Sequence, residues 1–255
     1  MPRWIRFAVP VVALWLVPFA AQAGTVVEFQ TQLGGFRVEL MDDAAPNTVA
    51  NFLSYVTSGE YNGSVFHRAS GIDGGGGKLI PFVLQGGGFY PLPDGAQFVP
   101  EVPNHGPIKS EWIGTPNSRG TIAMAVPVTG GVPNLDGASN QWYFNLNDNQ
   151  AIINPPQIVV FGKVLGNGMD VVDLISNQQT YNFGGDFNTL PLLPSYTPAK
   201  FFAGTVPSPE DWITINVHVV PEPASLAMAA GGAALVGGVL LRRQRRRSRF
   251  RRRAH

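Results

Sequence analysis

Three stretches of the chain have residue types that could bind a metal ion or a phosphate group. The pair Asp42-Asp43 and the triplet Asn147-Asp148-Asn149 offer the carboxylate and amide oxygens that calcium prefers, but neither has the ligand spacing of an EF-hand loop. The run Gly74 to Gly77 has the composition of a phosphate-binding loop, yet no Lys-Ser/Thr pair follows it. We therefore expect no metal site and interpret the glycine run as a flexible insertion.

Composition excludes several other kinds of chemistry. The 255 residues include no cysteine, which excludes disulfides, thiolate catalysis and cysteine-ligated zinc or iron–sulfur sites. Charged residues make up 14% of the chain, and its 30 glycines and 22 prolines favour turns and short strands over a coiled coil or a helical bundle. Residues 24–220 contain seven Lys and Arg against sixteen Asp and Glu, a net charge of −9. This part should repel nucleic acid phosphates, so we expect no nucleic-acid partner.

The first 23 residues have the pattern of a secretory signal peptide. Arg3 and Arg6 precede an apolar run from Phe7 to Ala20, and Ala21-Gln22-Ala23 provides small residues at the cleavage positions. We expect export across the cytoplasmic membrane, with a retained membrane anchor as the alternative.

The last 36 residues have a second targeting pattern. Pro221-Glu222-Pro223 is followed by the uncharged run Ala224 to Leu241, which is about 27 Å long as a helix and sufficient to span a bilayer. Nine arginines between Arg242 and Arg253 then favour a cytoplasmic C-terminus with the body outside. A nucleic-acid-binding tail and a plain single-pass anchor are the alternatives.

The order of these three parts resembles the PEP-CTERM sorting signal of Gram-negative bacteria. The resemblance implies processing by an exosortase-type enzyme and release to the cell surface or the extracellular matrix. The predicted organisation is a signal peptide over 1–23, one domain over 24–219, and a sorting signal over 220–255 that contains a transmembrane helix at 224–241.

Periodicity predicts a mainly β domain. Apolar residues at three- and four-residue spacing predict one helix from Pro46 to Gly59 and a second over Met169 to Ile175. Alternating or apolar runs predict short strands at Val26 to Gln30, Phe36 to Leu40, Val65 to His67, Phe82 to Gln85, Thr121 to Val126, Gln141 to Leu146, Ile158 to Phe161 and Trp212 to Val217. Such strands with two helices favour a closed or nearly closed barrel.

Seven blocks of sequence occur in an order typical of one family. They are Ala45 to Phe52, Tyr61 to Gly63, Phe66 to Arg68, Phe82 to Gly87, Arg119 to Ala125, Ser139 to Asn145 and Val160 to Val164. These blocks resemble the cyclophilins, and the resemblance covers about residues 25 to 218. The resemblance implies a closed eight-stranded antiparallel β-barrel capped by two α-helices, peptidyl-prolyl cis/trans isomerase activity on proline-containing segments, and no cofactor or metal.

The resemblance also implies which residues act. The reaction rotates an X–Pro bond whose barrier of about 18–20 kcal/mol comes from amide resonance, and the twisted proline nitrogen gains a lone pair that can accept a hydrogen bond. By resemblance, Arg68 donates this bond and Gln85 orients Arg68. Substrate contacts are implied for Phe82, Val83, Gln141, Tyr143 and Ile152. The alternatives are a surface ion pair for Arg68 and ordinary core positions for Phe82, Val83 and Tyr143; we expect a structural role for His67.

Several departures from the family pattern concern the surroundings of the site. A glycine-rich loop over Ser70 to Ile80 lies beside it, and Val126-Pro127 replaces the usual Asn-Ala pair. Ile158 stands where many eukaryotic members have a histidine, and the segment Thr180 to Pro209 is longer than in a minimal member and should wrap the barrel as an ordered loop.

Two functions of different classes follow. The first is an exported isomerase that assists the folding of exported proteins. The alternative is a catalytically weak proline-peptide binding module of the cell envelope or extracellular matrix.

Overall fold

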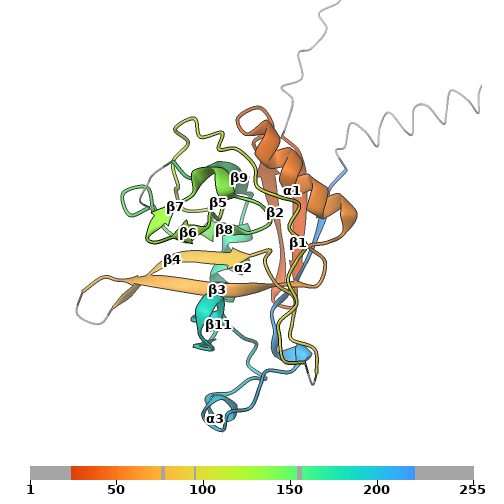
Figure 1. The fold of residues 1–255 in the computed structure, drawn as a ribbon, viewed down its shortest axis with the longest axis vertical. Helices are drawn as coiled ribbons and strands as arrows, with labels where there is room; N and C mark the ends of the chain where they lie inside the picture. Colours follow the sequence, from red (N-terminus) through yellow and green to blue (C-terminus); the bar gives the residue numbers. More distant parts are fainter. Residues whose placement is uncertain (1–23, 76–77, 95, 154–156, 222–255) are drawn as a thin grey trace, which may run out of the picture.

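The computed structural model describes residues 24–75, 78–94, 96–153 and 157–221 (Figure 1). Its helices are α1 (Pro46–Ser58), α2 (Gly168–Ser176) and α3 (Pro198–Phe202), with short 3-10 turns η1 (Leu135–Gly137), η2 (Gly185–Phe187) and η3 (Pro209–Asp211). Its strands are β1 (Val26–Thr31), β2 (Gly34–Leu40), β3 (Ser64–Asp73), β4 (Leu79–Gly86), β5 (Thr121–Met124), β6 (Val128–Thr129), β7 (Val132–Pro133), β8 (Trp142–Asn145), β9 (Val160–Val164), β10 (Thr180–Tyr181), β11 (Leu190–Pro191) and β12 (Thr214–Val219).

Eight antiparallel strands form a closed barrel in the order β1-β12-β3-β4-β8-β5-β9-β2. The first and last strands of the domain are neighbours, with Val27 opposite Val219. The predicted eight-stranded barrel is therefore confirmed. Closure matters because it leaves the barrel without an unpaired edge.

Aromatic side chains fill the barrel. Phe29 lies at the centre, stacked on Phe36 at 5.1 Å and in edge contact with Trp142 and Phe144. These side chains are at most 3% exposed, and burying each contributes about 1.5–3 kcal/mol. Helix α1 adds Phe52 to this core, and α2 adds residues such as Val172. Both predicted helices therefore pack against the barrel core.

Helix α1 begins without a capping side chain of its own. Its N-cap residue is Ala45, which forms no side-chain cap hydrogen bond. Instead Glu111, from the long connection between β4 and β5, accepts hydrogen bonds from the backbone N–H groups of Asn47 at 3.0 Å and Thr48 at 2.8 Å. A carboxylate at a helix N-terminus is favourable because the first N–H groups lack intrahelical partners.

The segment Ser70 to Ile80, predicted as a flexible loop, is largely a β-hairpin, so that prediction is wrong. Strands β3 and β4 remain paired as far as Asp73 opposite Leu79 and run side by side beyond the barrel (Figure 1). The pairing continues through Ile72 opposite Ile80, whose β-branched side chains favour extended structure. Near the turn, Gly74 N–H donates to the Lys78 carbonyl at 2.8 Å.

The segment Thr180 to Pro209 is ordered, as predicted, but it contains short elements rather than a plain loop. It forms the β10–β11 pair, η2 and a third helix, α3, which lies below β11 in Figure 1. Its apolar residues, among them Tyr181, Leu190 and Tyr196, build a second cluster against Val65 and Trp212. This cluster packs on the outside of the barrel, because Val65 precedes the core residue Phe66 on β3 and so points to the opposite face of the strand.

The two predicted targeting segments lie at the ends of the chain. The predicted signal peptide over 1–23 and the predicted transmembrane helix over 224–241 lie outside the described residues. Within the ranges that are described, no helix has both the length and the apolar character required to cross a bilayer.

Candidate active site

A row of outward-facing residues crosses four neighbouring strands of the barrel. Arg68 on β3 lies opposite Gln85 on β4, Gln85 opposite Tyr143 on β8, and Tyr143 opposite Ala123 on β5. Directly opposed residues of antiparallel strands point to the same face, so the row forms one surface. The adjacent row, Ala69, Leu84, Phe144 and Ile122, points into the barrel, and three of its four members belong to the buried core. Successive residues along each strand thus point alternately to the site and to the core.

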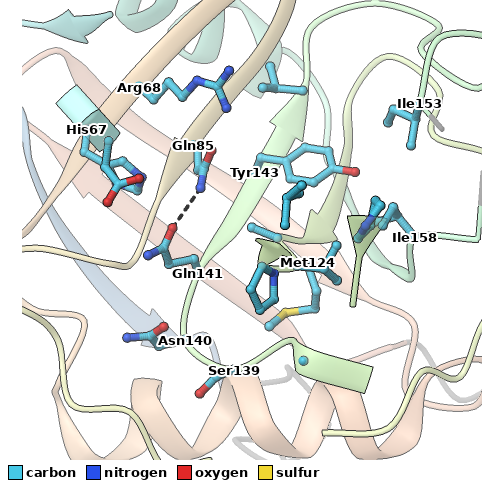
Figure 2. A pocket seen from close by; sticks show the side chains of 18 of the residues that line it. His67, Arg68, Gln85, Met124, Ser139, Asn140, Gln141, Tyr143, Ile153 and Ile158 are labelled. Carbon is cyan, nitrogen blue, oxygen red and sulfur yellow. Dashed lines mark hydrogen bonds between the residues drawn. The ribbon is translucent and has the colours of Figure 1, made fainter. Parts of the chain in front are cut away.

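Three residues of this row, Arg68, Gln85 and Tyr143, line a groove with a volume of about 840 Å³. The groove brings together all seven predicted site residues: Arg68, Phe82, Val83, Gln85, Gln141, Tyr143 and Ile152. Figure 2 shows Arg68, Gln85 and Gln141 gathered at one side and Ile153 and Ile158 at the other, with Tyr143 between them. The groove therefore has a polar side and an apolar side.

The Arg68 side chain is half-buried at the polar side. Its Nε atom is buried and has no hydrogen-bond partner among the described residues, and no described carboxylate lies within ion-pair distance. The alternative of a surface ion pair is therefore wrong for the described part of the chain. A guanidinium carries five N–H donors and stays charged, so Arg68 brings donors to the groove that have no partner among the described residues.

Two glutamines form a pair beneath Arg68. Gln85 Nε2 donates a hydrogen bond to Gln141 Oε1 at 2.8 Å. With its nitrogen directed at Gln141, Gln85 presents its carbonyl oxygen on the side that faces Arg68 (Figure 2). Gln141 thus fixes which end of the Gln85 amide faces Arg68, and the role of Gln85 in orienting the arginine stays a prediction.

His67, next to the arginine, is buried at 1% exposure. Its ring lies edge-on to Phe89 at 5.0 Å and to Phe187 at 6.3 Å. Burial, followed by the neighbouring charge of Arg68, lowers the pKa of His67 from 6.5 to about 3. The imidazole is therefore neutral at physiological pH, which fits the structural role predicted for it.

The apolar side consists of residues that pack as a third cluster outside the barrel core. Val83, Ala123, Tyr143, Ile158 and Val160 form it, with Phe82 and Ile153 packed against it. Val83 and Tyr143 are buried, at 5% and 8% exposure, and Phe82 packs against their cluster. The alternative of core positions therefore holds in part, but all three residues also line the groove. A proline ring would find here the apolar contacts it requires.

Tyr143 is held in place by a buried polar network. Its hydroxyl donates to Asn117 Oδ1 at 3.0 Å, and Asn145 Nδ2 donates to the same oxygen at 3.1 Å. Asn149 Nδ2 in turn donates to Asn145 Oδ1 and to the Phe82 carbonyl at 2.7 Å. Burial raises the pKa of Tyr143, so its hydroxyl remains protonated and acts as a donor. The network connects two walls of the groove, the Tyr143 ring and the Phe82 backbone.

The substrate contact implied for Ile152 is supported only in part. Ile152 lines the groove but is 42% exposed, whereas its neighbour Ile153 packs against the outer cluster. Met124 and Ile158 also line the groove; Met124 was not singled out from the sequence, and Ile158 was named only as a departure from the family pattern. The signal for Ile158 was present, since its position corresponds to a family histidine.

Two further lining segments were not predicted. One is the β6–β7 hairpin, whose signal was Gly130-Gly131 between β-branched residues. The other is η2, for which Asp186 lines the groove and no sequence pattern gave a signal.

Asp42 and Asp148, from the two clusters considered as metal ligands, accept hydrogen bonds from neighbouring segments of the chain. Asp42 accepts hydrogen bonds from the backbone N–H of Thr25 at 2.6 Å and from its hydroxyl at 3.0 Å. Asp148 accepts from the backbone N–H of Arg119 at 3.0 Å. In the described part of the chain, no group of three or more His, Asp or Glu residues is placed to hold a metal ion.

Comparison with known proteins agrees with this geometry. The family model of the cyclophilin type peptidyl-prolyl cis-trans isomerases matches residues 26–190, and that of the PEP-CTERM protein-sorting motif matches residues 219–247. A peptidyl-prolyl cis-trans isomerase of Acinetobacter baylyi is 39% identical over 174 residues, covering 66% of this chain and 81% of its own. Peptidyl-prolyl cis-trans isomerase B of Escherichia coli is 36% identical over 166 residues, covering 62% of this chain and 88% of its own.

Among solved structures, a cyclophilin type peptidyl-prolyl cis-trans isomerase of Cryptosporidium parvum aligns with a TM-score of 0.48 at 20% identity, covering 78% of this chain and 99% of its own. The family match over residues 26–190 covers more than half of the sequence and contains Arg68, Gln85 and the apolar side of the groove. The chain therefore belongs to the cyclophilin-type peptidyl-prolyl cis-trans isomerases and carries a PEP-CTERM sorting motif.

Proposed function

We propose that this isomerase acts on exported proteins and that Arg68 stabilises the twisted X–Pro bond of the substrate. The observation that carries the proposal is the position of Arg68 beside the apolar side of the groove with its buried Nε unpartnered among the described residues. A proline ring against Phe82, Val83 and Tyr143 would place the prolyl nitrogen within reach of the guanidinium.

The chemistry requires only selective stabilisation of the twisted state. As the bond rotates, amide resonance is lost and the nitrogen lone pair becomes an acceptor, so a hydrogen bond from Arg68 forms in the transition state and not in the planar ground state. A charge-assisted hydrogen bond of about 1.5–3 kcal/mol corresponds to a rate factor of about 10 to 150. Gln85 keeps the guanidinium in position, and Gln141 keeps Gln85 in position.

The two targeting segments support an action on exported proteins. We assign residues 1–23 to a signal peptide, 24–219 to the isomerase domain and 220–255 to the sorting signal, with a membrane-spanning helix over 224–241 and the domain outside. Processing of the tail by an exosortase-type enzyme would release the domain to the cell surface or the matrix. Clients would then be other exported proteins that contain X–Pro bonds.

The decisive test compares two substitutions of Arg68 with a matched control. Cis/trans exchange of an Ala-Pro peptide is measured by NMR with the full chain in detergent. We expect Arg68→Ala to lower kcat/KM about 100-fold and Arg68→Lys to restore only part of it, because lysine lacks the planar set of donors. Arg37→Ala is the control, since Arg37 is an exposed arginine that pairs with Glu28 away from the groove. Equal activity of Arg68→Ala and the wild type would refute the role of Arg68.

A catalytically weak proline-peptide binding module is the second candidate. The observation that favours it is the apolar pair Val126-Pro127 in the groove lining, where a side-chain amide for the substrate backbone is missing. A wild-type protein that binds the Ala-Pro peptide and leaves its exchange at the spontaneous rate would support this candidate.

A further inference from the structure

The groove has two different ends, and the strand order separates them. Its floor crosses β3, β4, β8 and β5 in that order, and neighbouring strands are about 4.8 Å apart, so β3 and β5 lie roughly 14 Å from each other. An extended peptide covers this distance with about four residues. A substrate that crosses the groove therefore meets both ends at once, on opposite sides of its X–Pro bond.

The end at β5 is apolar. The chain leaves Met124 through Ala125 and Val126 and continues into the β6–β7 hairpin, whose Val128 and Pro133 line the groove. Val128 is 61% exposed, so its side chain is available to a ligand.

The hairpin is attached firmly at its base. Asn134 N–H donates to the Pro127 carbonyl at 2.9 Å. Leu135, which follows, packs against the outer apolar cluster that contains Tyr143. The apolar surface of the hairpin is thus continuous with the proline pocket.

The end at β3 carries a carboxylate. The turn η2 presents Asp186 to the groove, beside the strand that bears Arg68. The turn is fixed by Phe187, whose ring lies 4.8 Å from that of Phe89, and by the Thr189 carbonyl, which accepts from Ala69 N–H at 2.9 Å.

The carboxylate of Asp186 has no ion-pair or hydrogen-bond partner in the described part of the chain, and the side chain is exposed. Among the described residues that line the groove, Arg68 and Asp186 are the two with a charge at neutral pH, since burial keeps His67 neutral. Arg68 is assigned to the X–Pro bond itself, which leaves Asp186 to face a side chain of the flanking substrate.

From this arrangement we infer that the groove selects X–Pro segments that carry an aliphatic side chain on one side of the proline and a basic side chain on the other. The aliphatic residue packs on Val128 and Pro133 of the hairpin, and the Lys or Arg pairs with Asp186. The inference rests on the proposed function, because it names the substrate class of the same groove.

The test uses two hexapeptides of equal composition and opposite order, Ala-Leu-Ala-Pro-Lys-Ala and Ala-Lys-Ala-Pro-Leu-Ala, with blocked ends. Both keep the same Ala-Pro bond, and an all-alanine peptide around Ala-Pro is the parent. With the full chain, one of the two orders should be isomerised with a kcat/KM about fivefold above the other and above the parent, because burying the equivalent of about one methylene group and forming one weak, exposed ion pair gives a factor of this size. The favoured order also gives the direction in which the peptide lies.

Two variants assign the preference to the two ends. Val128→Ser should remove the contribution of leucine, and Asp186→Asn that of lysine; together they should make the two orders equal. Val206→Ser and Asp43→Asn are the controls, because Val206 is equally exposed at 60%, Asp43 is an exposed acid, and neither lines the groove. Raising the salt concentration should weaken the preference for lysine and leave that for leucine.

The outcomes separate the inference from the function on which it rests. Equal rates for the two orders, with the parent isomerised, would overturn the substrate preference alone. A parent peptide that exchanges only at the spontaneous rate would overturn the proposed function and, with it, the inference.

Discussion

Gln85 and Gln141 are joined by a hydrogen bond of 2.8 Å in which the Gln85 amide nitrogen is the donor. The bond decides the orientation of a side chain that could otherwise rotate by half a turn and present its nitrogen to Arg68. A carbonyl oxygen attracts a guanidinium, whereas an amide N–H₂ group repels it. We therefore expect Gln141 to affect Arg68 through the orientation of the Gln85 amide.

This relationship predicts different effects for two substitutions of Gln141. Gln141→Leu removes the acceptor, frees Gln85 to rotate and should lower kcat/KM about tenfold, roughly the effect of one hydrogen bond of 1.4 kcal/mol. Gln141→Glu keeps an acceptor oxygen and should retain most of the activity. NMR exchange measurements on both proteins check this, and similar losses in the two variants would contradict it.

Removing the Tyr143 hydroxyl should destabilise the domain. Tyr143→Phe deletes the hydrogen bond to Asn117 but leaves Asn145 as a donor to the same oxygen, so the free energy of unfolding should fall by about 1 kcal/mol. Urea unfolding gives this value. Tyr181→Phe is the matched comparison, because it loses a buried hydroxyl that donates to the Tyr196 carbonyl and Tyr181 does not line the groove.

The buried His67 makes stability depend on pH in a defined window. The pKa of His67 is about 3 in the folded protein and 6.5 for a free imidazole, the value that we take for the unfolded chain. As the pH falls below 6.5, the unfolded chain therefore binds a proton that the folded protein does not, and the native state loses stability. Between pH 7 and pH 5 this single group should cost about 2 kcal/mol of unfolding free energy.

Unfolding of the wild type and of His67→Gln at both pH values isolates this effect from that of the carboxylates. The variant should lose clearly less stability than the wild type over the same interval. Identical pH dependence of the two proteins would mean that His67 does not titrate on unfolding.

Glu111 should stabilise helix α1 from a distance. Burial raises the pKa of Glu111, but hydrogen bonds from Thr48 and Asn47 outweigh burial and leave the pKa below its usual value of 4.5. The ionised carboxylate therefore stabilises the fold above that pH, and its contribution is lost as the pH falls. Glu111→Ala should reduce the free energy of unfolding by about 1 kcal/mol at pH 7, the usual effect of losing a helix cap.

The pH dependence provides the control for this prediction. The difference between Glu111→Ala and the wild type should shrink once the pH drops well below 4.5, because both proteins then lack the charged cap. A constant difference over this range would show that Glu111 acts through packing alone.

Features that depend on residues close together in the chain could be predicted from the sequence, whereas features that depend on contacts between distant residues could not. Local periodicity predicted α1, α2 and most barrel strands, because helix and strand alternation are visible within a dozen residues. The Glu111 cap could not be predicted, since Glu111 lies 63 residues from Thr48 and the pairing exists only after the barrel has formed. The site residues came from the family resemblance, and periodicity alone would have assigned Tyr143 to the core.

The two hairpins show where composition misleads. Glycines between Gly71 and Gly77 suggested a flexible loop, but pairing of Ile72 with Ile80 extends β3 and β4 through part of that stretch. The β6–β7 hairpin had a clear signal in Gly130-Gly131, whose positive φ angles of 59° and 79° suit a tight turn, and it was missed because its strands are only two residues long.

The neighbouring first and last strands have a mechanical consequence. Val220 N–H donates to the Val26 carbonyl at 2.8 Å, so the chain enters and leaves the barrel at the same end of the β1–β12 ladder. A pulling force between the two ends of the domain would act across this ladder and open its hydrogen bonds one at a time, starting from Val26, instead of shearing them together. Tension on the C-terminal tail against an N-terminal tether would thus peel β12 from β1 first, and the barrel would yield at its closure before the strands that carry the groove.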